Sequence, residues 1–69
     1  RGRVHRRLME LMSHHNLEEG ELVAFVNRRT GEGYRRMGEF SLVLLKRALE
    51  RLEQEPEAFL QEIVQTLEG

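Results

Sequence analysis

The sequence predicts an all-α protein, a compact bundle of four short helices. Three observations support this prediction. Apolar residues recur at spacings of three and four residues in four separate stretches of the 69-residue chain, which is the period of an amphipathic helix. Residues that favour helix ends stand between these stretches. No stretch alternates apolar and polar residues for long enough to form a sheet.

The first helix is expected over residues 4–15, because one helical face carries Val4, Leu8, Leu11 and Met12. Asn16 follows and is expected to cap the second helix, over residues 17–29, with Glu19 closing a capping box. The glycine inside this helix, Gly20, is expected to mark a close helix crossing. The second helix is expected to bury Leu22, Phe25 and Val26.

The connection after the second helix divides into a turn and a short mixed segment. Residues 30–33 read Thr-Gly-Glu-Gly, and glycine readily takes the left-handed conformation that ends a helix. From residue 34 to residue 40, aromatic, basic, apolar and acidic residues alternate. Three of them, Tyr34, Met37 and Phe40, are expected to hold the connection against the core.

The last two helices are predicted from a helical seam and a proline. Ser41 is expected to cap the third helix, whose seam consists of Leu42, Leu45, Leu49 and Leu52. Pro56 suits the first position of a fourth helix, because its missing N–H does no harm there. This helix is expected to bury Phe59, Leu60, Ile63, Val64 and Leu67. We expect Leu45, Leu49, Phe59 and Ile63 to share one core.

The length of the chain allows one helical domain, residues 1–69. A domain this small buries only about 60% of its unfolded surface, so self-association or a partner is expected to support it. The chain starts at Arg1, and we interpret it as a domain excised from a longer protein. The chain has no cysteine, which suits an intracellular, cytoplasmic protein. No apolar run approaches the roughly 20 residues of a membrane span, so no membrane partner is expected.

The sequence gives no indication of catalysis, metal binding or a cofactor. His14 and His15 are adjacent, so their side chains point about 100° apart on a helix, and with His5 they lack the spacing of a helical zinc site. Neither serine lies in a nucleophile motif. No nucleophile, base and orienting group can be assembled, and the chain is therefore predicted not to be an enzyme.

The charges are unevenly distributed along the chain. Eight of the eleven basic residues but only five of the twelve acidic residues precede Met37. Four arginines, Arg28, Arg29, Arg35 and Arg36, flank one turn. Charge patterning leaves two interpretations open, an anion-binding patch and a solvated surface offset by nearby glutamates. We take the patch as the candidate binding site, and its residues are Arg28, Arg29, Tyr34, Arg35, Arg36, Met37 and Phe40.

The same charges disfavour reading of duplex DNA by a helix-turn-helix. The first residues of its second helix would meet the bases, and here these are Glu18, Glu19 and Glu21. A nucleic acid could instead contact the arginine loop through its phosphates. An accessory nucleic-acid-binding domain is therefore the alternative to a protein-interaction module.

The order of these features resembles a short helical module of phage and mobile-element proteins, such as the GemA-like regulators and the modules appended to single-strand annealing recombinases. The resemblance covers about two thirds of the chain. It rests on residues 4–6, 16–22, 28–31, 37–41 and 45–52, and the acidic fourth helix has no counterpart in it. It implies docking onto DNA replication or recombination proteins.

The sequence thus predicts a docking module without catalytic activity. Its basic loop is expected to receive an acidic peptide segment of a protein partner, with Tyr34, Met37 and Phe40 as an apolar floor for a hydrophobic residue of that segment. An uncovered apolar seam is expected to support that partner or a second copy of the chain.

Overall fold

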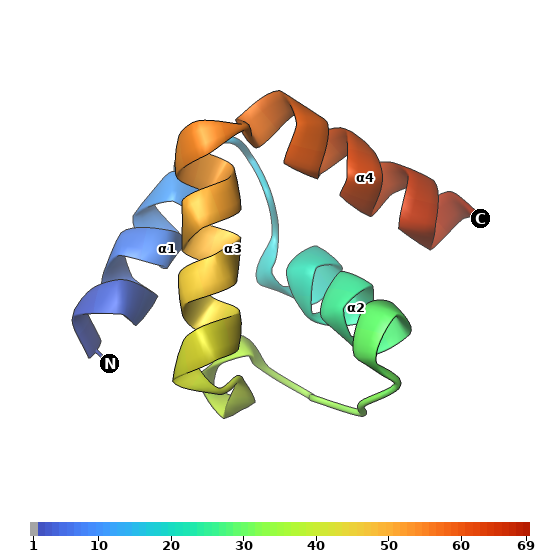
Figure 1. The fold of residues 1–69 in the computed structure, drawn as a ribbon, viewed down its shortest axis with the longest axis horizontal. Helices are drawn as coiled ribbons and strands as arrows, with labels where there is room; N and C mark the ends of the chain where they lie inside the picture. The colour runs from blue at the N-terminus through green and yellow to red at the C-terminus, as the bar shows by residue number, and fades with distance from the viewer. Residues whose placement is uncertain (1) are drawn as a thin grey trace.

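Four α-helices and one short 3-10 helix make up the computed structural model, which describes residues 2–69 (Figure 1). The predicted all-α bundle of four helices is confirmed. The elements are α1 (Gly2–His14), α2 (Glu19–Thr30), η1 (Met37–Glu39), α3 (Leu42–Gln54) and α4 (Pro56–Glu68).

The helices pack as two pairs that meet at the end of α3. Helix α1 lies along α3, whereas α2 lies against α4 (Figure 1). The chain turns sharply from α3 into α4 at Glu55, and Pro56 starts α4 as predicted. Helix α1 lies on the far side of α3 from α2 (Figure 1).

One continuous apolar core joins all the elements. Its buried residues are Leu8, Met12, Leu17, Leu22, Val23, Phe25, Val26, Met37, Phe40, Leu45, Ala48, Leu52, Phe59 and Ile63. The shared core of Leu45, Phe59 and Ile63 is confirmed. Leu49 is only partly buried and packs at the edge of this core.

Two residues that the helical period placed in the core lie at the surface. Val64 is 44% exposed and Leu42 is 38% exposed. Both follow the apolar pattern of their helices, but neither α3 nor α4 is covered on every side of its apolar stripe. The apolar pattern of the sequence therefore overestimates the burial of these two side chains.

The start of α2 differs from the prediction. Asn16 does not cap α2, because it adopts the left-handed conformation (φ 57°) that closes α1. Asn16 N donates to Ser13 O, and Leu17 N donates to Met12 O, which is the hydrogen-bond pattern of a Schellman ending. The N-cap is Glu18, whose backbone N–H donates to Glu21 Oε1 at 3.0 Å. Asparagine suits both roles, and the core contact of Leu17 selects the helix ending.

The other helix ends follow the local sequence. Ser41 Oγ accepts a hydrogen bond from Leu44 N at 3.2 Å and caps α3. Gly31 ends α2 with φ 77°, and its N–H donates to Asn27 O at 2.8 Å. Both features are as predicted.

Replacing Gly20, inside α2, and Gly31, at the end of α2, with alanine is expected to change the free energy of unfolding in opposite directions. Nothing lies within 4 Å of a Cβ built on Gly20, so the expected close helix crossing at this residue is wrong. Gly20→Ala should therefore raise the free energy of unfolding by up to about 1 kcal/mol. Gly31→Ala should lower it by about 1 kcal/mol, because alanine is strained at positive φ. Urea denaturation followed by circular dichroism measures both, and shifts of the same sign would contradict this assignment.

Candidate functional site

The two loop arginines of the predicted site are exposed. Arg35 and Arg36 lie between Tyr34 and η1. The backbone N–H of Arg35 donates to Glu39 Oε1 at 3.1 Å, which fixes the loop without using the guanidinium group. Within residues 2–69, neither guanidinium forms an ion pair or a hydrogen bond. Both cations are therefore available to a ligand.

The two helical arginines of the predicted site are engaged with α4. Arg28 Nη1 donates to the backbone carbonyl of Thr66 at 2.9 Å, where a cation also suits the negative end of a helix. Arg29 Nη1 lies 3.3 Å from Glu62 Oε2. The four arginines thus divide by their contacts into a pair that holds α2 to α4 and a pair that is free of ion pairs among the described residues.

The apolar members of the predicted site serve the core. Met37 and Phe40 have no exposed surface, so their expected role as an apolar floor for a ligand is wrong. Tyr34 is half-buried, and its ring meets that of Phe40 edge to face at 5.1 Å. The expectation that these three residues hold the connection against the core is confirmed.

A side-chain amide of α2 fixes the course of the loop. Asn27 Nδ2 donates to Tyr34 O, and Tyr34 N donates to Asn27 Oδ1, both at 2.9 Å. Glu19 Oε2 accepts from Met37 N at 2.9 Å, so this carboxylate holds η1 instead of closing a capping box. Neither contact was predicted from the sequence, because no helical or strand period relates partners that are 7 and 18 residues apart across a loop.

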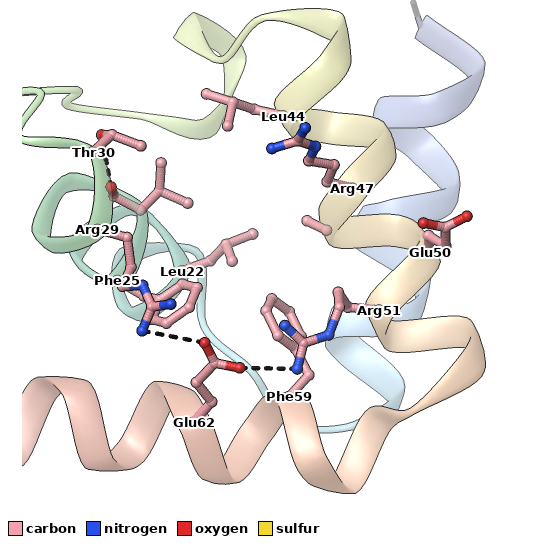
Figure 2. A pocket seen from close by; sticks show the side chains of 12 residues that line it. Leu22, Phe25, Arg29, Thr30, Leu44, Arg47, Glu50, Arg51, Phe59 and Glu62 are labelled. Carbon is pink, nitrogen blue, oxygen red and sulfur yellow. Dashed lines mark hydrogen bonds and ion pairs between the residues drawn. The ribbon is translucent and has the colours of Figure 1, made fainter.

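An open groove of about 460 Å³ lies between α2 and α3 and is closed at one end by α4 (Figure 2). Its apolar lining comes from all three helices and consists of Leu22, Phe25, Val26, Leu44, Ala48 and Phe59. The connection that carries Arg35 and Arg36 borders the end opposite α4, where Thr30 and Leu44 line the groove. The groove therefore adjoins the loop of the predicted site.

Charged side chains surround the apolar lining of the groove. They are Arg29, Arg47, Glu50, Arg51 and Glu62. Arg47 is exposed and, within residues 2–69, forms no ion pair or hydrogen bond. Arg47 and Arg51 stand four residues apart on α3 and hence on the same side of the helix. That spacing was the signal in the sequence that could have identified them.

Two phenyl rings contact each other at the α4 end of the groove, and a guanidinium group lies over each of them. The rings of Phe25 and Phe59 meet edge to face at 5.6 Å. Arg29 lies over the Phe25 ring at 5.7 Å, and Arg51 lies over the Phe59 ring at 4.8 Å, both within the range of cation–π attraction. This end of the groove therefore offers an aromatic surface next to two positive charges.

Four large apolar side chains are exposed outside the groove. They are Met9, Leu42, Val43 and Val64. Val43 is the most exposed of them at 59%. They stand on three different helices. Self-association of the chain stays a prediction.

The described residues contain no cluster of three His, Asp or Glu side chains that could hold a metal ion. The rings of His14 and His15 meet edge to face at 5.0 Å. None of the helices in residues 2–69 is long and apolar enough to cross a membrane.

The fold and the groove define the class of molecule, a small all-α domain with an open, arginine-bordered groove between three of its helices. Comparison with protein family models, with curated protein sequences and with solved structures gave no match.

Proposed function

We propose that the domain is a docking module without catalytic activity, and that it binds an acidic segment of a protein partner. The observation that carries this proposal is the groove, in which an apolar lining from α2, α3 and α4 is bordered by arginines. Such a surface suits a segment that presents a hydrophobic side chain and carboxylates together, since guanidinium groups bind carboxylates through two parallel hydrogen bonds.

The free arginines support an acidic partner. Arg47 on the groove and Arg35 and Arg36 on the adjoining loop lack ion pairs within residues 2–69. Binding a carboxylate at these side chains would break no ion pair. The absence of cysteine suits a partner inside the cell, and the resemblance to phage modules would place it among replication or recombination proteins.

The proposal is tested with a synthetic peptide in which two aspartates flank a leucine, with asparagine in place of aspartate in the control peptide. Isothermal titration calorimetry should show binding of the acidic peptide and weak or no binding of the control. The double variant Arg35→Glu, Arg36→Glu should weaken binding about tenfold or more. Its helical content should be unchanged, because both residues lie outside the helices.

The matched control is Arg3→Glu, Arg6→Glu, which changes the net charge by the same amount. Arg3 and Arg6 are exposed on α1 and form no ion pair within residues 2–69. Helix α1 lies on the far side of α3 from α2 (Figure 1), and no residue of α1 lines the groove. This variant should retain most of the affinity. Equal losses in the two variants would show that only net charge matters and would contradict a localised site.

The same titrations with an oligonucleotide distinguish the alternative function. Contacts to several phosphates release counterions and give a steep decrease of affinity with salt. If the protein binds a single-stranded or duplex oligonucleotide with such a slope and does not bind the acidic peptide, the domain is an accessory nucleic-acid-binding domain and the proposal is overturned.

A further inference from the structure

Glu62 of α4 is held between two arginines at the end of the groove. Its Oε1 accepts a hydrogen bond from Arg51 Nη2 of α3 at 2.9 Å, and its Oε2 lies 3.3 Å from Arg29 Nη1 of α2. The close view shows this carboxylate reaching from α4 toward both guanidinium groups (Figure 2). A carboxylate of the protein itself therefore lies between two of the three arginines that line the groove.

The contacts of Glu62 are weaker than those a carboxylate can make with arginine. Each guanidinium uses one nitrogen for Glu62, although arginine can offer two parallel donors to one carboxylate. Arg51 Nε lies 3.1 Å from Glu55 Oε1 but makes no hydrogen bond, although this nitrogen is buried. The side chains of Arg29, Glu62 and Arg51 are 57%, 29% and 33% exposed, so water weakens these ion pairs. Separating them should cost little.

The surroundings of the two arginines suit a ligand carboxylate next to an apolar group. Arg29 lies over the Phe25 ring and Arg51 over the Phe59 ring, and the two rings contact each other edge to face. The remaining apolar lining of the groove continues from these rings toward Leu44. A hydrophobic side chain of a ligand could lie along this surface while a neighbouring carboxylate reaches the arginines.

We propose that Arg29 and Arg51 form the subsite for a carboxylate of the acidic partner segment, and that Glu62 occupies this subsite in the free protein. This inference rests on the proposed function and specifies its recognition element. The partner carboxylate replaces Glu62 on the arginines, so Glu62 competes with the partner and lowers its affinity. Arg29, Arg47 and Arg51 line the groove together with Glu50 and Glu62, and Glu55 stays paired with Arg51.

The test compares Glu62→Gln with Glu57→Gln, using the acidic synthetic peptide and calorimetry. Glutamine retains the size of the side chain and a hydrogen-bond acceptor but loses the charge that holds the arginines. Glu62→Gln should tighten binding about three- to tenfold, the effect of removing one solvent-screened internal competitor. Glu57→Gln makes the same change of charge on α4. Glu57 is exposed and forms no ion pair within residues 2–69, so its removal should alter the affinity less than twofold.

A second measurement applies to the unmodified protein and does not depend on the stability of a variant. Addition of the peptide should shift the nuclear magnetic resonance signal of the Glu62 carboxyl carbon and the Nε–H signals of Arg29 and Arg51. The carboxyl signal of Glu57 should stay in place. Signals of Glu62 that do not move at saturating peptide would overturn the inference.

The outcomes separate the inference from the proposed function. If the parent binds the peptide but Glu62→Gln binds it equally or more weakly, the docking function stands and Glu62 is a structural tie between helices. If neither protein binds the acidic peptide, the docking function fails and the subsite fails with it. Sedimentation of Glu62→Gln without peptide is also informative, because a dimer formed only by this variant would make a second copy the occupant and overturn the acidic partner.

Discussion

Phe59→Ala is expected to lower the free energy of unfolding by about 3–5 kcal/mol, the largest effect of any single change considered. Phe59 is 3% exposed, and its ring contacts both Phe25 of α2 and Arg51 of α3. Truncation would leave a cavity where three helices meet. Domains are stable by only about 5–15 kcal/mol, and this small domain lies toward the low end. A large fraction of the variant could therefore be unfolded at room temperature.

Urea denaturation followed by circular dichroism measures this loss, and Val64→Ala is the matched control. Val64 lies on the same helix and is 44% exposed, so its truncation should cost no more than about 0.5 kcal/mol. If the two variants unfold at the same urea concentration, α4 does not pack on α2 and α3 through Phe59.

Asn27→Ala is expected to release the loop that carries Arg35 and Arg36. The Asn27 side chain forms two hydrogen bonds to the backbone of Tyr34, both at 2.9 Å. Alanine leaves a partly buried backbone donor and acceptor without these partners, which should cost about 1–3 kcal/mol. Amide hydrogen exchange is the direct measurement, and the Tyr34 amide should lose its protection.

Asn27→Asp serves as the control for this prediction. Aspartate retains the oxygen that accepts from Tyr34 N but sets its second oxygen against Tyr34 O, so the Tyr34 amide should keep more protection than in Asn27→Ala and less than in the parent protein. Equal exchange rates of this amide in Asn27→Ala and the parent protein would show that the loop is held by other contacts. Loss of peptide binding in Asn27→Ala, with a folded core, would further link the loop position to the proposed site.

The local parts of the fold were predictable from sequence. Helical periods and end signals such as Ser41, Pro56 and Gly31 act over a few residues, and the structure agrees with them. Asn16 shows the limit of such signals, because asparagine suits both the start of one helix and the end of another. The buried contact of Leu17 resolves this choice, and that contact is not local.

The candidate site was predictable only in part. The exposed, basic character of Arg35 and Arg36 follows from a short polar loop, and the structure places both at the surface. The sequence predicted that Met37 and Phe40 hold the connection against the core, but it could not show that both are completely buried and therefore closed to a ligand, because a short mixed segment has no helical or strand period to assign its faces. It also gave no reason to link Arg29 with α4.

Four amphipathic helices with basic residues concentrated before Met37 follow from the order of residues alone, because period, capping and charge depend on neighbours within a turn or two. Which charges meet depends on how the helices pack. Glu62 lies 33 positions from Arg29 and 11 from Arg51 in the numbering of the chain, yet the crossing of α2, α3 and α4 brings all three side chains to one end of a groove. The physical reason is that burial of Phe25, Phe59 and their apolar neighbours fixes how the helices cross, and the charged side chains at their edges are placed by that packing.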